Sequence, residues 1–283
     1  MHDSNIGTLY VVATPIGNLG DMVPRAIEVL QMVDIIAAED TRHSGKLLQH
    51  FGVSTKLIAY HDYSNEQRLQ KIIDILLSGQ SVALISDAGT PLISDPGYEL
   101  VNVARSHAIR VVPIPGACAL IAALSVSGLP SNQFIFEGFL PAKSTSRCKV
   151  LVALENEHRT VVFYESPHRI VDSLKDFQVT LGGDRQIVLA REITKTYETV
   201  LSGSINDVLE QVTQDPNQQR GEFVVLLKGC PLKPRGDIGV TPEAEKLMRV
   251  LLEHVPVKTA SAIAAKVTEC KKRDLYQWAL SIK

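Results

Sequence analysis

The alternation of apolar and polar positions predicts short strands separated by amphipathic helices along the first 229 residues. The predicted strands are residues 8–14, 34–40, 56–60, 81–86 and 109–114, then 160–165, 186–192, 198–203 and 221–229. Segments between them, such as 65–79, repeat apolar residues every three or four positions, which is typical of an amphipathic helix. The strands are apolar almost throughout, as expected where helices cover both faces of a largely parallel sheet.

The order of these elements predicts an α/β protein with two α/β/α domains and a small appendage. We expect an N-terminal domain at residues 1–137 and a second domain at 138–229. Residues 230–283 begin with the Pro- and Gly-rich segment "CPLKPRGDIGVTPE", which is typical of a linker, and continue with about three short helices. The helical part fits a helix-turn-helix and a small bundle equally well.

Charge is distributed unevenly along the chain. Residues 229–283 contain ten Lys or Arg and six Asp or Glu, whereas the whole chain has a formal net charge of −2. A modestly basic end fits a polyanionic partner, and it also fits a solvated helical face.

Composition and motifs exclude several classes of protein. With 283 residues, 45% of them hydrophobic, the chain has an ordinary globular composition. Its four cysteines lack CxxC spacing and its histidines lack helical pairing, so we expect reduced thiols and no metal site. There is no GK[ST] loop, GxGxxG fingerprint or GxSxG elbow. Without a signal pattern or a long apolar segment, the protein is predicted to be soluble, cytoplasmic and free of membrane contacts.

Glycine and proline gather where the predicted strands end. The segments concerned are "TPIGNLGD" (14–21), "AEDTRHSG" (38–45), "SDAGTPLISDPG" (86–97), "PGACAL" (115–120), "YESPHR" (164–169) and "REITKTYE" (191–198). In open α/β sheets, ligands bind at the carboxyl ends of the strands. The segment 86–97 is also longer than a strand-to-helix connection requires. One interpretation is a capped turn, with Ser94 or Asp95 capping the next helix and Pro96 in its first turn. The other is a ligand site built by all these ends together.

Six ordered blocks between about residues 7 and 229 carry a resemblance to a known family. They are "ATPIGNLGD", "AEDTR", "SDAGTPLISDPG", "PIPGACA", "FYESPHR" and "REITKTYE". Together they resemble the tetrapyrrole-methylase-type S-adenosylmethionine (SAM) methyltransferases, and among these the ribosomal RNA small subunit branch. The C-terminal end is similar to the extension of that branch. The resemblance implies two α/β domains around a cofactor cleft, usually in a homodimer.

The resemblance also implies a reaction, which is methyl transfer from SAM to the ribose 2′-hydroxyl of cytidine 1402 in 16S rRNA. Whether free RNA or the 30S subunit is the substrate stays open. A tetrapyrrole substrate is the alternative inside the superfamily, and a non-catalytic ribosome-assembly factor is the alternative outside it.

Similarity to the family implies a set of cofactor-binding residues in both domains. These are Pro15, Asp87, Ala88, Gly89, Thr90, Cys118, Ala119, Phe163, Tyr164, Ala190 and Val224. Small side chains at Cys118 and Ala119 leave room for the amino-acid end of SAM, and nearby helix N-terminal amides suit its carboxylate.

Candidates for the substrate side follow from charge and position. Glu165 and Lys195 are the catalytic candidates, with Glu39, Asp40 and Glu192 as other possible proton acceptors. A lysine accepts a proton near neutral pH only if burial lowers its pKa. The candidate RNA-binding residues are Arg42, Arg169, Arg191, Lys271, Lys272 and Arg273, because guanidinium and ammonium groups suit phosphate. Trp278 fits RNA contact and also the core of a small domain.

Overall fold

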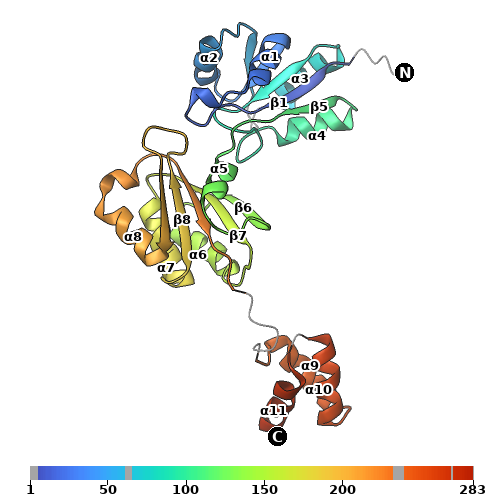
Figure 1. The fold of residues 1–283 in the computed structure, drawn as a ribbon. Helices are drawn as coiled ribbons and strands as arrows, with labels where there is room; N and C mark the ends of the chain where they lie inside the picture. Colours follow the sequence, from blue (N-terminus) through green and yellow to red (C-terminus); the bar gives the residue numbers. More distant parts are fainter. Residues whose placement is uncertain (1–5, 61–65, 232–238, 269, 283) are drawn as a thin grey trace. The chain divides into compact units, whose positions relative to one another are not determined.

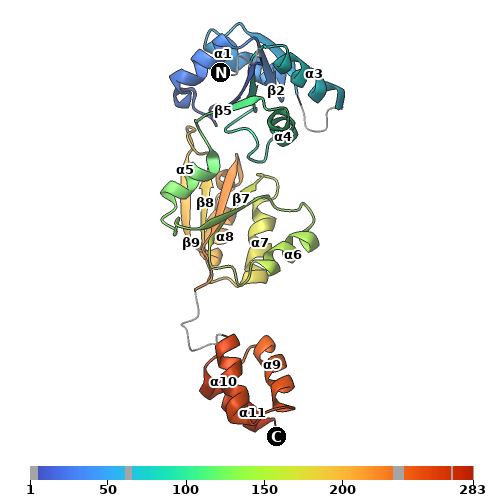
Figure 2. The same cartoon turned by 90° about the vertical axis from the view of Figure 1, so that its right-hand side faces the viewer.

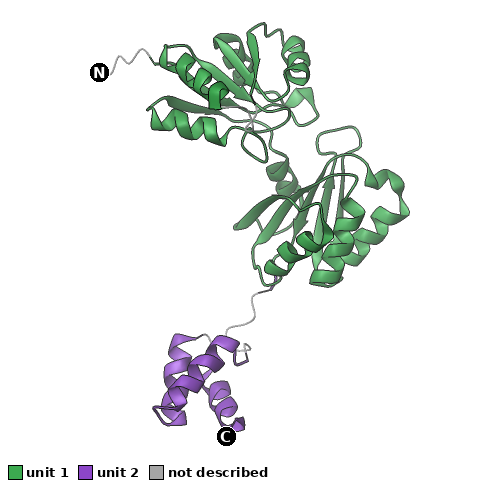
Figure 3. Ribbon diagram, turned by 180° about the vertical axis from the view of Figure 1, so that it is seen from behind, with its two compact units in different colours: residues 1–229 green, residues 230–283 purple. Residues whose placement is uncertain are grey.

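The structure is a computed structural model that describes residues 6–60, 66–231, 239–268 and 270–282. It divides into two compact units, Met1–Gly229 and Cys230–Lys283 (Figure 3). The larger unit contains two five-stranded sheets, and the smaller unit is helical (Figure 1).

The first sheet is parallel throughout. Its strands, in spatial order, are β3 (Lys56–Ala59), β2 (Ile35–Ala38), β4 (Val82–Ile85), β1 (Thr8–Val12) and β5 (Arg110–Ile114). Because β2 and β4 are buried at every residue, their side chains are apolar on both faces. The predicted parallel sheet is therefore confirmed, and its strand ends gather at one edge.

Helices cover both faces of this sheet (Figures 1 and 2). The helices are α1 (Pro24–Met32), α2 (Thr41–His50), α3 (Glu66–Leu77) and α4 (Tyr98–Ser106), with a short 3₁₀ helix η1 (Leu19–Asp21) before α1. Leu30 of α1 and Leu48 of α2 pack with Ile36 on one face. Leu76 of α3 and Leu100 of α4 form part of the core on the other face.

The second sheet is mixed. Its strands, in spatial order, are β6 (Phe134–Phe139), β7 (Thr160–Glu165), β10 (Phe223–Leu227), β8 (Gln186–Arg191) and β9 (Thr199–Ser204). Only the β6–β7 pairing among them is parallel within the described residues. Strands β8 and β9 are joined by residues 192–198 alone, and so short a connection requires an antiparallel pair. The predicted boundary between residues 137 and 138 falls within β6.

The second sheet is also covered on both faces. One face packs against α6 (Ser144–Ala153), α7 (Ile170–Leu181) and α8 (Ile205–Gln214), which is followed by η2 (Pro216–Gln219). The other face packs against α5 (Ala119–Val126), which follows β5 of the first sheet. Leu120 and Leu124 of α5 lie with Val162, Val188 and Val224 of this sheet. Helix α5 therefore carries the chain from the first sheet to the second.

Local sequence signals mark several helix ends. Ser204 caps α8 in a capping box with Asp207, and Asp40 caps α2 through a hydrogen bond from the Arg42 backbone. Pro24 occupies the first turn of α1, where its missing N–H costs nothing. Such contacts satisfy backbone donors that a helix leaves free at its N-terminus.

The smaller unit is built from α9 (Pro242–Leu252), α10 (Val257–Val267) and α11 (Lys272–Ser281). Its core is made of small and medium apolar residues, which are Ala244, Met248, Ala260, Ala264, Cys270, Leu275 and Ala279. Trp278 packs against this core, and the guanidinium of Arg249 lies 5.4 Å from the centre of its ring. Trp278 is thus partly buried against the core of this unit, whereas Tyr276 on the same helix is exposed.

Candidate active site

A cavity of about 380 Å³ lies within the larger unit and is lined by segments that follow strands of the first sheet and by residues of the second sheet and its loops. The segments after β1, β4 and β5 contribute Ile16, Ala88, Thr90, Ile93, Ser94, Asp95, Cys118 and Ala119. The second sheet and its loops contribute Phe139, Tyr164, Glu165, Ser166, Pro167, Ala190, Ile193, Glu222, Phe223 and Val224. This volume is within the range of small-molecule sites in proteins.

The segments after β1 and β4 are joined by backbone hydrogen bonds. The N–H of Thr14 donates to the carbonyl of Gly89 at 2.8 Å, and the N–H of Gly89 donates back at 3.0 Å. Gly89 has φ of +84°, a conformation that glycine adopts without strain. The hydroxyl of Thr90 donates to the carbonyl of Ala117 at 3.0 Å, which ties the loop to the segment after β5.

The loop 86–97 does not end in the helix cap that one interpretation predicted. Helix α4 begins at Tyr98, and its N-cap is Gly97, with no side-chain capping bond among the described residues. Gly97 has φ of +133°, and a Cβ there would lie 2.7 Å from the Leu84 side chain. Ser94 and Asp95 instead line the cavity, so the prediction that one of them caps α4 is wrong.

Asp95 lies in an environment that disfavours its charge. Burial raises the pKa of Asp95 to about 6, and the negative charges of Glu39 and Asp87 act in the same direction. A hydrogen bond with Ser86 acts against them. A carboxyl with a pKa near neutrality in a cavity is a candidate for proton transfer.

The N-terminus of α5 meets the cavity from another side. Cys118 is the N-cap and Ala119 the first residue of α5, and both line the cavity. The N–H of Leu120 donates to the Tyr164 hydroxyl at 3.2 Å, which positions that ring. Burial raises the pKa of the Tyr164 phenol well above its ordinary value, so the group is neutral at physiological pH.

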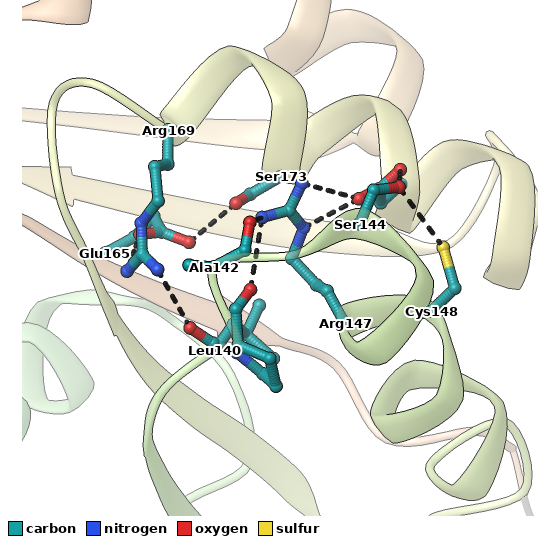
Figure 4. A network of polar contacts seen from close by, with 10 residues as sticks. Leu140, Ala142, Ser144, Arg147, Cys148, Glu165, Arg169 and Ser173 are labelled. Carbon is teal, nitrogen blue, oxygen red and sulfur yellow. Dashed lines mark hydrogen bonds and ion pairs between the residues drawn. The ribbon is translucent and has the colours of Figure 1, made fainter.

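Glu165 has both carboxylate oxygens engaged (Figure 4). One oxygen accepts from the Ser166 N–H at 2.7 Å and pairs with Arg169 at 2.6 Å, and the other accepts from the Ser173 hydroxyl at 2.6 Å. The side chain is 0% exposed. Arg169 also donates to the carbonyl of Leu140 at 3.1 Å, so this network ties the end of β6 to α7.

A second arginine, which is buried, supports the same segment (Figure 4). Arg147 donates to Asp176 at 2.7 Å and to the carbonyls of Pro141 and Ala142 at 3.3 and 3.4 Å. The hydroxyl of Ser144 donates to Asp176 at 2.9 Å. Both arginines thus satisfy backbone carbonyls behind the cavity wall.

Lys195 is held between two carboxylates. Its ammonium lies 2.9 Å from Glu192 and 2.9 Å from Glu222. Burial acts to lower the pKa of Lys195, but the hydrogen bonds and charges of these two groups outweigh it and raise the pKa. The condition for Lys195 to accept a proton is therefore not met. Its stem lies against Gly17, where any side chain would collide with it.

The predicted cofactor residues divide into two groups. Those that line the cavity are Ala88, Thr90, Cys118, Ala119, Tyr164, Ala190 and Val224. Pro15 and Gly89 are chain neighbours of lining residues. Asp87 lines a separate hollow with Glu39 and Asp40, where it accepts a hydrogen bond from the Asp40 N–H at 3.1 Å.

Phe163 needs a correction. It lies in the core on the opposite face of the sheet, with its ring 5.5 Å from that of Phe177. Neighbouring side chains on a strand point to opposite faces, so Tyr164 and Phe163 cannot both reach the cavity.

The predicted RNA-binding arginines of the larger unit differ in solvent exposure and in the hydrogen bonds that they already make. The Arg42 side chain is 90% exposed beside Asp40. Arg169 belongs to the Glu165 network described above. Arg191 is buried and donates to the carbonyls of Arg220 and Tyr197 at 2.6 and 3.0 Å, so its predicted phosphate contact is not supported. In the smaller unit, Lys271, Lys272 and Arg273 are exposed at the start of α11.

Sequence reasoning missed part of the cavity lining. Asp95 was considered only as a helix cap, and Ile16, Ile93 and Ile193 were not singled out although they stand within the quoted loops. Backbone strain marks the same loops, but it shows only in the structure and could not have guided the sequence analysis. Leu92, Ser94, Glu192 and Thr194 have positive φ, and such residues gather at functional sites.

The two sheets share a cavity at their strand ends and are joined by a helix that passes from one to the other. The chain belongs to the tetrapyrrole (corrin/porphyrin) methylase family, which matches residues 8–209. The solved uroporphyrin-III-C-methyltransferase from Thermus thermophilus has a TM-score of 0.55 over 78% of this chain and 94% of that chain. At 19% identity, this likeness shows the shared fold alone.

Within the family, the chain belongs with proteins named Ribosomal RNA small subunit methyltransferase I. It is 53% identical to the one from Pseudomonas aeruginosa over 97% of this chain and 97% of that protein. It is 51% identical to the one from Vibrio cholerae over 96% and 94% of the two chains. Residues 239–283 match the family described as the RsmI C-terminal HTH domain. None of the helices in the described part of the chain is long and apolar enough to cross a membrane.

Proposed function

We propose that the protein transfers a methyl group from SAM to the ribose 2′-hydroxyl of cytidine 1402 in 16S ribosomal RNA. The observation that carries the proposal is the identity of about half of all residues with relatives named for methylation of small-subunit ribosomal RNA. The aligned region covers 96–97% of this chain. The nucleotide and the ribose oxygen follow from the resemblance of the six sequence blocks.

The cavity fits SAM in size and in the chemistry of its walls. Ile16, Ala190 and Val224 offer an apolar wall for an adenine ring. The N-terminus of α5 has no side-chain cap among the described residues. The Leu120 N–H donates to the Tyr164 hydroxyl, and the other amides of the first turn are suited to a carboxylate. When bound, SAM supplies a methyl group on a sulfonium, which is already activated for transfer.

The residues of the chain contribute to the proposed reaction mainly by holding the walls of the cavity in place, so that the reacting groups are aligned. The Thr14–Gly89 bridge and the Thr90–Ala117 hydrogen bond hold the loops after β1, β4 and β5 together on one side of the cavity. The Glu165–Arg169 network holds the opposite wall. Alignment of reacting groups contributes about 7–11 kcal/mol in favourable intramolecular reactions.

The RNA is proposed to contact the exposed cations of both units. Arg42 stands at the start of α2 and lines the hollow that also contains Asp87. Lys271, Lys272 and Arg273 stand at the start of α11, beside the exposed ring of Tyr276. Cations next to an aromatic ring suit phosphate and a splayed base. We further propose that the protein works in the cytoplasm as a homodimer, on free 16S rRNA or on the 30S subunit.

Methyl-labelled SAM distinguishes this function from its alternatives. The enzyme is incubated with labelled SAM and with 30S subunits, with 16S rRNA lacking the modification, or with a uroporphyrinogen macrocycle. Label in the RNA and none in the macrocycle supports the proposal. Label in the macrocycle alone supports a tetrapyrrole methylase, and SAM binding without transfer to any acceptor supports a non-catalytic factor.

A further inference from the structure

Three aromatic side chains line the cavity within the described part of the chain, and they differ in exposure. Phe223 is buried, and Tyr164 is partly buried with its hydroxyl accepting a hydrogen bond from the Leu120 N–H. Phe139, at the end of β6, is 55% exposed. It therefore lies where the cavity opens to solvent, and more than half of the residue is accessible to a ligand.

A β-bulge in β6 turns Phe139 toward the cavity. Side chains along a strand point alternately to opposite faces of the sheet. Ile135 packs into the core on the face covered by α6, α7 and α8, whereas Phe136 packs on the other face with Tyr164. Strict alternation would place Phe139 on the same face as Ile135. The pairing of β6 with β7 shifts between Phe136 and Gly138, however, and Phe139 is then paired with Tyr164.

The bulge depends on a glycine and is followed by a fixed segment of backbone. Gly138 has φ of +66°, a conformation that residues with a side chain rarely adopt. One extra residue in a strand moves the following side chains to the other face, and bulges re-aim side chains next to functional sites. Immediately after Phe139, the carbonyl of Leu140 accepts from Arg169 at 3.1 Å (Figure 4). The Glu165–Arg169 network therefore also holds the backbone beside Phe139.

The ring of Phe139 is held by an aromatic contact. Its centre lies 5.6 Å from that of Tyr164, with an angle of 62° between the two ring planes. Phe136 contacts Tyr164 in the same edge-to-face manner, with the ring centres 4.9 Å apart. Because Tyr164 is itself held by the Leu120 N–H, the ring of Phe139 is positioned before any ligand arrives. A side chain that is already ordered loses little conformational freedom on binding.

The place of Phe139 in the sheet separates it from the wall proposed for the adenine of SAM. The strand order is β6-β7-β10-β8, so Phe139 lies on the edge strand and Ala190 lies three strands away. Neighbouring strands are about 4.8 Å apart, which gives roughly 14 Å across the sheet. An adenine ring against Ala190 and Val224 therefore leaves Phe139 accessible to a second ring.

We propose that the ring of Phe139 stacks on the cytosine base of the nucleotide whose ribose is methylated, an inference that rests on the function proposed above. A ribose that enters the cavity carries its base with it, and that base leaves the stacking partners it had in the RNA. Proteins that bind single-stranded RNA replace such partners with aromatic side chains. Because stacking accepts any base, Phe139 holds the nucleotide and does not select cytosine.

The test is the kcat/KM for RNA in methyl transfer at saturating SAM, with 16S rRNA or with 30S subunits reconstituted from it. Two RNAs are compared, one with cytidine at position 1402 and one with an abasic ribonucleotide there, which keeps the 2′-hydroxyl. The variants are Phe139→Leu, which removes the ring, and Phe139→Tyr, which keeps it. Phe134→Leu is the matched control, because Phe134 is an exposed phenylalanine of the same strand that lies outside the cavity lining. Calorimetry measures the Kd of SAM for each variant.

We expect Phe139→Leu to lower kcat/KM for the cytidine RNA about 10-fold or more, since stacking of one base on an aromatic ring contributes a factor of about 5–150. The wild type should methylate the abasic RNA about 10-fold less efficiently, and Phe139→Leu should lower that value by less than about threefold. Phe139→Tyr and Phe134→Leu should stay within about threefold of wild type on both RNAs, and the Kd of SAM should change less than about threefold throughout. A merely structural role of Phe139 would instead lower kcat/KM by the same factor on both RNAs.

Other outcomes overturn the inference. A Phe139→Leu variant as efficient as wild type on the cytidine RNA, or equally impaired on both RNAs, shows that the ring does not stack on this base. A loss of SAM binding shows that the ring holds the cofactor instead. If the variants fail to fold, the wild type decides, since equal methylation of the two RNAs contradicts the inference. If the wild type methylates the cytidine RNA neither free nor in 30S subunits, the proposed function fails, and the inference fails with it.

Discussion

Two carboxylates line the same cavity, yet they differ in the contacts that their oxygens make. Glu165, at the end of β7, is buried and is neutralised by Arg169 and two hydrogen-bond donors. Asp95, on the loop after β4, lies near the like charges of Glu39 and Asp87. A neutralised carboxylate holds the fold together, whereas a carboxylate whose charge is opposed by burial and by like charges costs stability.

The largest expected effect on stability comes from Glu165→Gln. Removing one partner of a buried pair leaves the other charge uncompensated, which costs about 3–5 kcal/mol in typical proteins. Since the Arg169 side chain is 25% exposed, we expect a loss at the low end, about 3 kcal/mol, in the urea-induced unfolding free energy.

The matched control for Glu165→Gln is Glu157→Gln. Glu157 pairs with Arg159 at 2.8 Å at a more exposed position, so its loss should cost less than about 1 kcal/mol. Equal costs for the two variants would show that the Glu165 network is not what stabilises this wall. In that case the contrast with Asp95 would disappear.

Asp95→Asn should raise the free energy of unfolding, whereas Glu165→Gln should lower it. The pKa of Asp95 is raised to about 6 from 3.8, so its ionisation above pH 6 opposes folding, and the full stability is present only below about pH 4. A shift of two units corresponds to about 3 kcal/mol, which solvent screening reduces to about 1–2 kcal/mol. The variant should therefore gain about 1–2 kcal/mol in unfolding free energy at pH 7.5 and nothing at pH 4. Urea titrations at the two pH values measure this, and a loss of stability at pH 7.5 would contradict it.

Removing residues 236–283 tests whether the cavity works apart from the helical unit. Because Met1–Gly229 forms a compact unit, we expect the truncated protein to bind SAM with an unchanged Kd. Its affinity for 16S rRNA should fall about tenfold, which is about 1.4 kcal/mol, through loss of the cations at the start of α11. Filter binding and calorimetry measure the two affinities, and an unchanged RNA affinity would rule out this contact.

The smallest expected effect belongs to Lys195→Met. The salt bridges to Glu192 and Glu222 are partly exposed, so their loss should cost about 0.5–1 kcal/mol in unfolding free energy. The methylation rate should change less than threefold, because a protonated lysine accepts no proton. A rate reduced 100-fold with normal SAM binding would instead make Lys195 a catalytic residue.

The first sheet could be predicted from the sequence because burial on both faces requires its central strands to be apolar throughout. Strands β2 and β4 are apolar at every position, and that pattern indicated a parallel sheet covered on both faces. The same reasoning could not distinguish the second sheet, where β10 is also buried throughout but runs antiparallel to both neighbours. Strand direction there depends on connections such as 192–198, and not on burial.

The site was predictable at the level of loops and less so at the level of side chains. Tyr164 and Phe163 are adjacent aromatic residues, and the sheet turns only the first toward the cavity. Arg191 was expected to contact RNA, but its guanidinium donates hydrogen bonds to the backbone carbonyls of Arg220 and Tyr197, which the fold brings close to it. One interpretation placed Asp95 or Ser94 at the N-cap of α4, but Gly97 occupies that position. The loop before it contains positive φ at Leu92 and Ser94, which the sequence did not indicate. These outcomes depend on tertiary contacts that no local pattern encodes.

The most direct test of the central claim is the position of the transferred methyl group within the RNA. Unmodified 30S subunits and 16S rRNA are treated with the wild-type protein and methyl-labelled SAM, and nuclease fragments are then mapped by mass spectrometry. We expect one labelled methyl group on the ribose of cytidine 1402, which makes the adjoining phosphodiester resistant to alkali. Label on a base, on another nucleotide or in no fragment would contradict it.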